Sequence, residues 1–281
     1  MQLTTYDAAV AFLRLTQPHL EREEAANNLM LGIVLRLAGN PASYGSDPVY
    51  LATVSDEEGL VAAATMTPPH NLLVYGARPS CEAALGLIAQ NLERHHWSVP
   101  GVLGQLPAAH SFAEAWHVLT GQSVHVGMRE RVYELRRVLP VRSAPGWMRT
   151  AGEADLPLLK RWLEQFVIDA RMANSTDKTQ LAQRMVSDQD AYLWEDGQIV
   201  SLAARSRRLP HGIAIGPVYT PSEFRGRGYA TSCVAALSQR LLDEGWQYCC
   251  LFTDLSNPTS NDIYQQIGYR PLCDYEEYLF Q

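Results

Sequence analysis

This chain of 281 residues has little of several features that mark particular protein classes. Its five cysteines are an odd number and include no C-x-x-C pair. That pattern argues against a secreted disulfide scaffold and against a zinc or thioredoxin-type motif, so we expect no metal site. Only two lysines occur, Lys160 and Lys178, so almost all of the basic charge is arginine. This bias indicates a bacterial genome rich in G+C.

The sequence also lacks a long hydrophobic run and any excess of positive charge. Its longest apolar stretches, such as LMLGIVL at 29–35, are far shorter than the roughly 20 residues of a membrane helix. The first residues show no basic segment followed by an apolar core, as a signal peptide would. The formal net charge of −7 disfavours nucleic acids and anionic membranes as partners and welcomes a cationic amine. We therefore expect a cytoplasmic protein that binds neither nucleic acid nor membrane.

The composition, 47% hydrophobic and 19% charged, is that of a folded chain. The segment VLPVRSAPGW at 138–147 is rich in proline and glycine and is the best candidate linker. It predicts two domains, 1–140 and 146–281. Each half reads as a strand, helices, a meander of three strands, a helix, a strand, a helix and further strands, which is a mixed α/β fold with helices packed on a sheet.

Short sequence similarities between the two halves suggest that they have a common origin. Val74-Tyr75 in the first half corresponds to Val218-Tyr219 in the second, at an offset of about half the chain. We interpret this as a diverged internal duplication, the alternative being a chance match between two α/β domains.

The most informative stretch begins in a strand at Val218-Tyr219-Thr220 and runs through Arg225-Gly226-Arg227-Gly228 into a helix. A helix start carries free backbone N–H groups and the positive end of the helix dipole. Glycines without a Cβ let a ligand approach the backbone, and arginines add charge for phosphate oxygens. The stretch therefore predicts a site for a diphosphate. The alternative reading is a plain solvated turn before a helix.

Two familiar phosphate motifs do not fit this stretch. A Walker loop needs a Gly-Lys-Ser/Thr run, and no lysine is present here. A dinucleotide fingerprint needs glycine at position 231, which is Thr231. The pattern Arg-x-x-Gly-x-Ala, formed by Arg225, Gly228 and Ala230, instead resembles the acyl-CoA-binding motif of the GNAT superfamily of N-acyltransferases.

The resemblance continues downstream and covers about residues 147–281. Asn257, Asn261 and Tyr264 fit the GNAT pattern N-x-x-x-N-x-x-Y, and a Gly-aromatic pair follows at Gly268-Tyr269. Pro258 suits the first helical turn and Asn257 its cap. Tyr264 lies about 100° round the helix from Ile263, so we expect its side chain to reach the ligand cleft rather than the core.

The resemblance implies two GNAT-like domains, each a mixed, mostly antiparallel sheet flanked by helices. It implies that the second domain uses acetyl-CoA to acetylate an amine on a small molecule or peptide by direct attack in a ternary complex, with no metal. It implies that Tyr264 is the general acid for the departing thiolate and that Asn257 and Asn261 contact the pantetheine or phosphate arm. The cofactor-binding residues then implied are Val218, Tyr219, Thr220, Arg225, Gly226, Arg227, Gly228, Tyr229, Ala230, Thr231, Asn257 and Asn261. We also expect that Pro217, which has no N–H, breaks or bulges the pairing of the motif strand.

The first half shares only the order of elements with this family. Its corresponding loop, ARPSCEAALG, holds one basic residue, Arg78, and no Gly-rich basic turn, so we predict a degenerate domain that does not bind CoA. Several alternatives stay open. Tyr264 could be a packing residue, Asn257 a helix cap alone, and either Glu223 or Asp254 a proton relay. The alternative functions for the whole chain are a non-catalytic acyl-CoA sensor and an acyltransferase of the mycothiol synthase kind. The sequence also leaves open whether the chain forms a homodimer.

Overall fold

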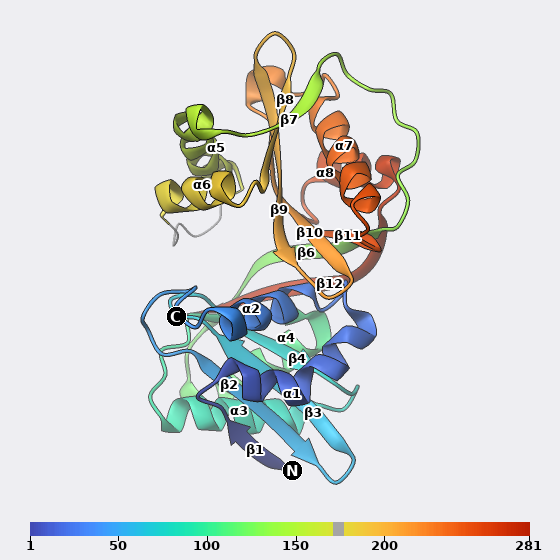
Figure 1. The fold of residues 1–281 in the computed structure, drawn as a ribbon. Helices are drawn as coiled ribbons and strands as arrows, with labels where there is room; N and C mark the ends of the chain where they lie inside the picture. Colours follow the sequence, from blue (N-terminus) through green and yellow to red (C-terminus); the bar gives the residue numbers. More distant parts are fainter. Residues whose placement is uncertain (171–176) are drawn as a thin grey trace. The chain divides into compact units, whose positions relative to one another are not determined.

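The structure, a computed structural model, describes residues 1–170 and 177–281 (Figure 1). The first series of elements is β1 (Gln2–Thr5), α1 (Ala9–Leu20), α2 (Asn28–Gly39), β2 (Tyr50–Asp56), β3 (Gly59–Met66), β4 (Leu72–Gly76), α3 (Glu82–Arg94), β5 (Gly101–Gln105), α4 (Leu106–Thr120) and β6 (Val124–Leu135). The second is β7 (Trp147–Thr150), α5 (Leu156–Asp169), α6 (Lys178–Ser187), β8 (Ala191–Glu195), β9 (Ile199–Arg208), β10 (Gly212–Tyr219), α7 (Tyr229–Asp243), β11 (Tyr248–Asp254), α8 (Pro258–Ile267) and β12 (Arg270–Phe280). The two series have the same order of strands and helices, which confirms the predicted mixed fold.

Contacts divide the chain into two compact units. The first comprises Met1–Val132 with Asp254–Ser256 and Leu272–Gln281, and the second comprises Tyr133–Thr253 with Asn257–Pro271. The candidate linker predicts that residues 146–281 form one domain, whereas most of the C-terminal strand β12 belongs to the first unit. The reason is backbone pairing, since Tyr275–Leu279 of β12 run antiparallel to Gly101–Gln105 of β5.

The first unit is built on the strand order β1-β2-β3-β4-β5-β12-β6. Strands β1 to β4 pair in antiparallel fashion, as do β5 and β12, whereas β4 and β5 are parallel. Three alternate residues of β2, Tyr50, Ala52 and Val54, pack with α3 and α4 in one hydrophobic core. This alternation is what a strand with period two produces when one of its faces meets helices.

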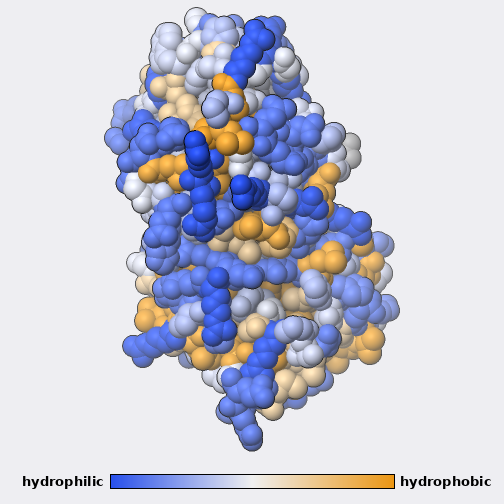
Figure 2. All heavy atoms as spheres, turned by 90° about the vertical axis from the view of Figure 1, so that its right-hand side faces the viewer, coloured by the Kyte–Doolittle hydropathy of each residue, from blue (hydrophilic) through white to orange (hydrophobic). Residues whose placement is uncertain are grey.

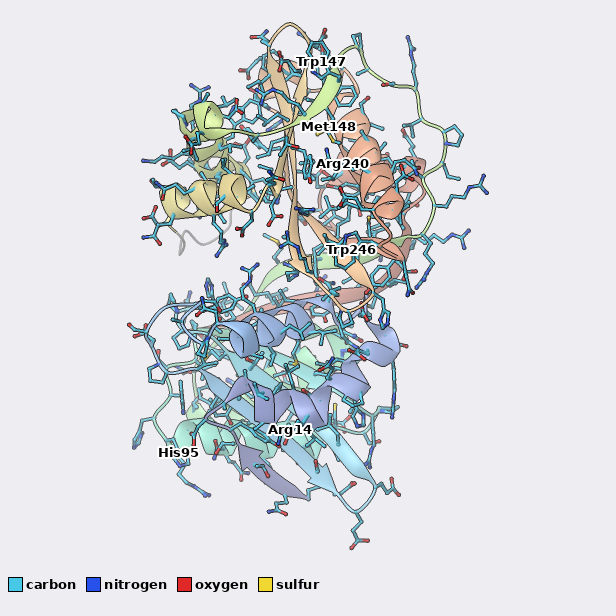
Figure 3. The ribbon with its side chains drawn as sticks, viewed as in Figure 1. Arg14, His95, Trp147, Met148, Arg240 and Trp246 are labelled. Atoms are coloured by element: carbon cyan, nitrogen blue, oxygen red, sulfur yellow. The ribbon has the colours of Figure 1, made fainter. Side chains whose placement is uncertain are left out.

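The second unit has the strand order β11-β10-β9-β8-β7 and helices on both faces (Figure 1). Tyr192 and Trp194 of β8 pack on the side of α7, whereas Ala191 and Leu193 pack on the side of α5 and α6. The edge strand β7 alternates in the same way: Trp147 is 57% exposed, and Met148 packs against the core that includes α7 (Figure 3). A sheet covered on both faces holds the loops at its end in fixed positions.

The surface agrees with the sequence composition. On the side that carries α7 and α8, Figure 2 shows mainly hydrophilic side chains with hydrophobic ones in small patches. Every helix among residues 1–170 and 177–281 is too short or too polar to cross a bilayer.

Candidate active site

The site begins where strands β10 and β11 separate. Gly212–Ala214 of β10 pair in parallel with Tyr248–Cys250 of β11, and the pairing of the two strands ends there. Strand β10 continues along β9, with irregular register between Ala214 and Ile215 and between Ile215 and Val218. The break that Pro217 predicts is therefore confirmed. Backbone groups of Val218 and Tyr219 that face β11 have no strand partner in the described part of the chain.

The next feature is the turn that follows β10. Gly226 and Gly228 have φ angles of +75° and +81°, a left-handed conformation that residues with a Cβ rarely adopt. A Cβ added at Gly226 would meet no atom within 4 Å, so the backbone there faces open space. Gly228 is the N-cap of α7 and has no side chain to accept the free N–H groups of the first helical turn. The turn thus presents amide donors and the positive helix end to that space.

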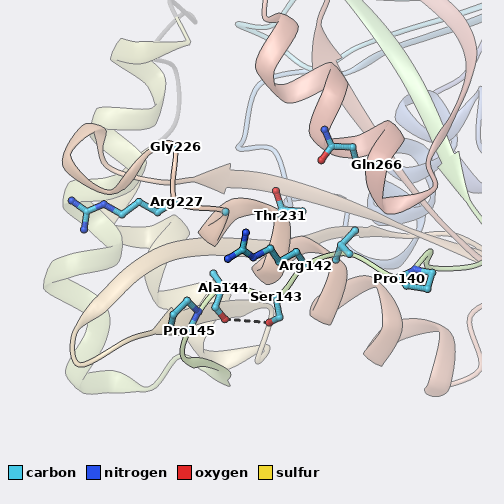
Figure 4. A pocket seen from close by; sticks show the side chains of 11 residues that line it. Pro140, Arg142, Ser143, Ala144, Pro145, Gly226, Arg227, Thr231 and Gln266 are labelled. Atoms are coloured by element: carbon cyan, nitrogen blue, oxygen red, sulfur yellow. Dashed lines mark hydrogen bonds between the residues drawn. The ribbon is translucent and has the colours of Figure 1, made fainter.

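A pocket of about 920 Å³ opens beside this turn (Figure 4). Its lining combines the turn and the start of α7 with the segment that leads into the second series of elements, and one residue of α8. It is lined by Pro140, Val141, Arg142, Ser143, Ala144, Pro145, Gly226, Arg227, Gly228, Thr231 and Gln266. Two of these residues are arginines and none carries a carboxylate, although the chain as a whole has a net charge of −7. An anion fits this lining better than a cation does.

The pocket contains some of the predicted cofactor residues and one region that the sequence treats only as a linker. Gly226, Arg227, Gly228 and Thr231 line it, and their contact with a cofactor stays a prediction. The sequence does not predict that Arg142 and its neighbours on the segment 140–145 line a pocket. A linker that crosses solvent and a linker that packs on a helix start have the same sequence features.

Arg225 differs from the expectation for a free phosphate ligand. Its Nη2 lies 2.6 Å from Oδ2 of Asp169, at the end of α5, and its Nε donates to the carbonyl oxygen of Thr220 at 2.9 Å. Hydrogen bonds from Gln165 and Arg225 lower the pKa of Asp169. Arg225 therefore ties the turn to α5 and to the end of β10.

Three other predicted residues are engaged in structural bonds. The hydroxyl of Tyr229 donates to Asp196 at 2.6 Å, in the turn between β8 and β9. Asn257 caps α8 by accepting the N–H of Ser260, as expected. Asn261 donates to the carbonyl oxygen of Asn257 at 2.8 Å and accepts from the hydroxyl of Tyr133 at 3.0 Å. These bonds hold the first turn of α8 in place, and a contact of the asparagines with the cofactor stays a prediction.

Tyr264 lies in the core, contrary to the expectation that helix geometry alone directs it to a cleft. It is 8% exposed, and its ring meets Tyr133 at 6.5 Å and Tyr269 at 5.8 Å between centroids. Ile263, its neighbour, is only partly buried. Burial raises the pKa of Tyr264 to about 12, so the phenol keeps its proton.

The two carboxylates considered as proton relays lie in different settings. Asp254 accepts from the N–H and the hydroxyl of Ser256, both at 2.7 Å, and belongs to the first unit. Glu223 is exposed in the short turn before Arg225 and accepts from Ser222. Neither carboxylate lines the pocket.

Comparisons with known proteins agree with this geometry. The family model described as FR47-like protein matches residues 193–279. A GNAT-family acetyltransferase from Colwellia psychrerythraea has a similar structure, with 13% identity, a TM-score of 0.61 and 100% of each chain covered. A GCN5-related N-acetyltransferase from Sphaerobacter thermophilus shares 17% identity at a TM-score of 0.63, covering 98% of this chain and 94% of that one.

A third similar structure is a tandem GNAT protein from the clavulanic acid biosynthesis pathway. It shares 13% identity at a TM-score of 0.58, and the match covers 99% of this chain and 98% of that one. No curated protein matches the sequence. Together with the separated strands and the glycine turn, these similarities show that the chain has the fold of the GNAT acetyltransferases, within which residues 193–279 match the FR47-like family.

Proposed function

We propose that this protein is an acyltransferase that moves an acetyl group from acetyl-CoA to a primary amine. The observation that carries the proposal is the cationic pocket at the Gly226–Gly228 turn, beside the opening between β10 and β11. Free amides at a helix start and a backbone that a ligand can approach are what a diphosphate needs.

Different parts of the site would bind the cofactor and stabilise the charge that develops during acyl transfer. The turn and the start of α7 would hold the diphosphate, and the opening beyond Ala214 would admit the pantetheine arm. Acetyl-CoA supplies the thioester whose carbonyl carbon the amine attacks. Unpaired N–H groups of β10, near Val218 to Thr220, would donate to the carbonyl oxygen as negative charge develops there.

The remaining steps concern protons. The N–C bond forms and the C–S bond breaks, so the amine must lose a proton to a base or to ordered water. The departing thiolate takes a proton, and Tyr264 is the proposed donor. Its raised pKa suits an acid that has to stay protonated until that step. Its ring packs against Tyr133 and Tyr269, so this role requires the thiolate to reach the inner end of the opening.

The diphosphate assignment is tested by a matched pair of substitutions, Gly226→Asp and Gly226→Asn. Asparagine and aspartate have the same shape and both tolerate a positive φ, but only aspartate adds a negative charge beside the proposed diphosphate. We expect calorimetry on the full chain to show CoA binding at least tenfold weaker for Gly226→Asp than for Gly226→Asn, which is about 1.4 kcal/mol. Equal affinities for the two variants would refute the assignment.

Acyl transfer itself is tested with acetyl-CoA and a panel of small amines and peptides, following the free thiol released. Thiol release that depends on the amine supports an enzyme. CoA binding without transfer to any amine would contradict it and would favour the alternative of a non-catalytic acyl-CoA sensor.

A further inference from the structure

The segment Pro140–Pro145 forms one wall of the pocket and is held in place by hydrogen bonds. Before it, the N–H of Leu139 donates to the carbonyl oxygen of Ile267 at 2.8 Å. Within it, the N–H of Ala144 donates to the hydroxyl of Ser232 on α7 at 2.7 Å, and that hydroxyl is buried. At its end, Nε1 of Trp194 donates to the carbonyl oxygen of Pro145 at 2.8 Å. Three anchors within seven residues hold this stretch against α8, α7 and β8.

Arg142 is the charged residue of this wall. Figure 4 shows its side chain extending from the segment toward the turn that carries Gly226 and Arg227. Arg142 is exposed, and among the residues that the structure describes it has no ion pair or hydrogen bond. By contrast, Arg149 and Arg225 of the same unit both pair with carboxylates. A guanidinium on a segment anchored from both sides, in a pocket lined by no carboxylate, fits an anionic group of a ligand.

The pocket has room for more than a diphosphate. Its volume of about 920 Å³ lies near the upper end of the range for pockets that hold a whole small ligand, about 300–1,000 Å³. The diphosphate has its own donors in the amides of the turn and the start of α7. Arg142 stands on the opposite wall, beside two prolines and a valine that suit the apolar face of a nucleoside. CoA carries one further phosphate, on the 3′ position of its ribose.

We propose that Arg142 binds the 3′-phosphate of CoA and makes the site prefer the 3′-phosphorylated cofactor. This inference rests on the proposed function, because it needs CoA to occupy the pocket. On this proposal, the stretch that connects the two series of elements is also part of the cofactor site. One charge-assisted bidentate contact accounts for the expected selectivity.

The test compares CoA with dephospho-CoA, which lacks only the 3′-phosphate, by calorimetry on the full chain. We expect the unmodified protein to bind CoA more tightly than dephospho-CoA. The substitution Arg142→Ala should weaken CoA binding about ten- to a hundredfold and leave dephospho-CoA binding unchanged. Arg137→Ala is the matched control, since Arg137 is exposed on the same stretch but does not line the pocket, and it should change neither affinity.

Two results would overturn the inference while leaving the proposed function intact. One is an unchanged CoA affinity in Arg142→Ala, and the other is an equal loss for CoA and dephospho-CoA, which would place Arg142 on a part that both ligands share. If the unmodified chain binds neither ligand, the proposed function itself fails. Because Arg142 is exposed and makes no hydrogen bond or ion pair with described residues, its replacement should not disturb folding, which a thermal melt verifies.

Discussion

At the scale of single residues, burial decides what Tyr264 can do. Its ring packs between Tyr133 and Tyr269, and removal from water disfavours the phenolate. Its pKa in the folded chain, about 12, lies above the value near 10 of an exposed tyrosine. Its contribution to stability is therefore complete below pH 10 and is lost as the pH rises toward 12. Over the working range of an enzyme the proton stays in place.

The prediction for Tyr264→Phe follows from this burial. Phenylalanine keeps the packing and removes only the hydroxyl, so the melting temperature and the affinity for CoA should stay close to those of the unmodified chain. Turnover should fall about a hundredfold or more, the usual cost of losing a general acid. Steady-state kinetics and calorimetry check the two halves of the prediction. Unchanged turnover would show that Tyr264 is only a packing residue.

At the scale of elements, the carboxylate of Asp155 links strand β7 to the start of helix α5. Asp155, just before α5, receives two hydrogen bonds from Arg149 of β7, at 2.7 and 2.9 Å, and one from the N–H of Gly152 at 2.8 Å. Asp155 is the N-cap residue of α5, but its side chain bonds back to the preceding strand and turn and does not cap the helix. The Arg149 hydrogen bonds, with that of Gly152, lower the pKa of Asp155. The anchor therefore depends on the ionised carboxylate.

We expect Asp155→Asn to lower the free energy of unfolding by about 2 kcal/mol at neutral pH, since a bidentate charged contact is lost while Arg149 stays partly solvated. Because the folded pKa is depressed, this stabilisation is present above about pH 4 and lost as the pH falls below it. Urea unfolding at neutral pH and at about pH 3 should show the gap between the two proteins shrinking. Glu153→Gln, an exposed neighbour, is the control. A gap that does not change with pH would contradict the role of the charge.

At the scale of the whole molecule, the loop between β4 and α3 in the first series differs from the loop between β10 and α7 in the second. In the first unit, Arg78 pairs with Asp56 at 2.8 Å and with Glu58 at 3.1 Å, so its charge is already balanced. The space that a Cβ on Gly76 would take lies 2.7 Å from the sulfur of Cys81. In the second unit, Gly226 instead faces open space. In the corresponding loop of the first unit, 77–81, the one basic residue is therefore already paired and no glycine is present.

The whole chain should accordingly bind one CoA. Calorimetric titration of the unmodified protein should give a stoichiometry near one, and Gly226→Asp should abolish most of the heat. A stoichiometry near two in the unmodified protein, falling to one full-strength site in Gly226→Asp, would show that the first unit also binds the cofactor.

The fold and part of the site could be predicted because their causes are local. Helical spacing of apolar residues, a proline without an N–H in β10 and glycines at positive φ act over a few neighbours. The order of elements, the interrupted pairing near Pro217 and the turn before α7 follow from them. The asparagine cap of α8 is equally local.

Only the tertiary structure decided which distant groups meet. It placed β12 beside β5 in the first unit, paired Arg225 with Asp169, turned Tyr264 into the core and set Arg142 against the start of α7. Each of these contacts joins residues far apart in the chain. Their formation depends on how helices and strands pack, which the identity of neighbouring residues does not specify.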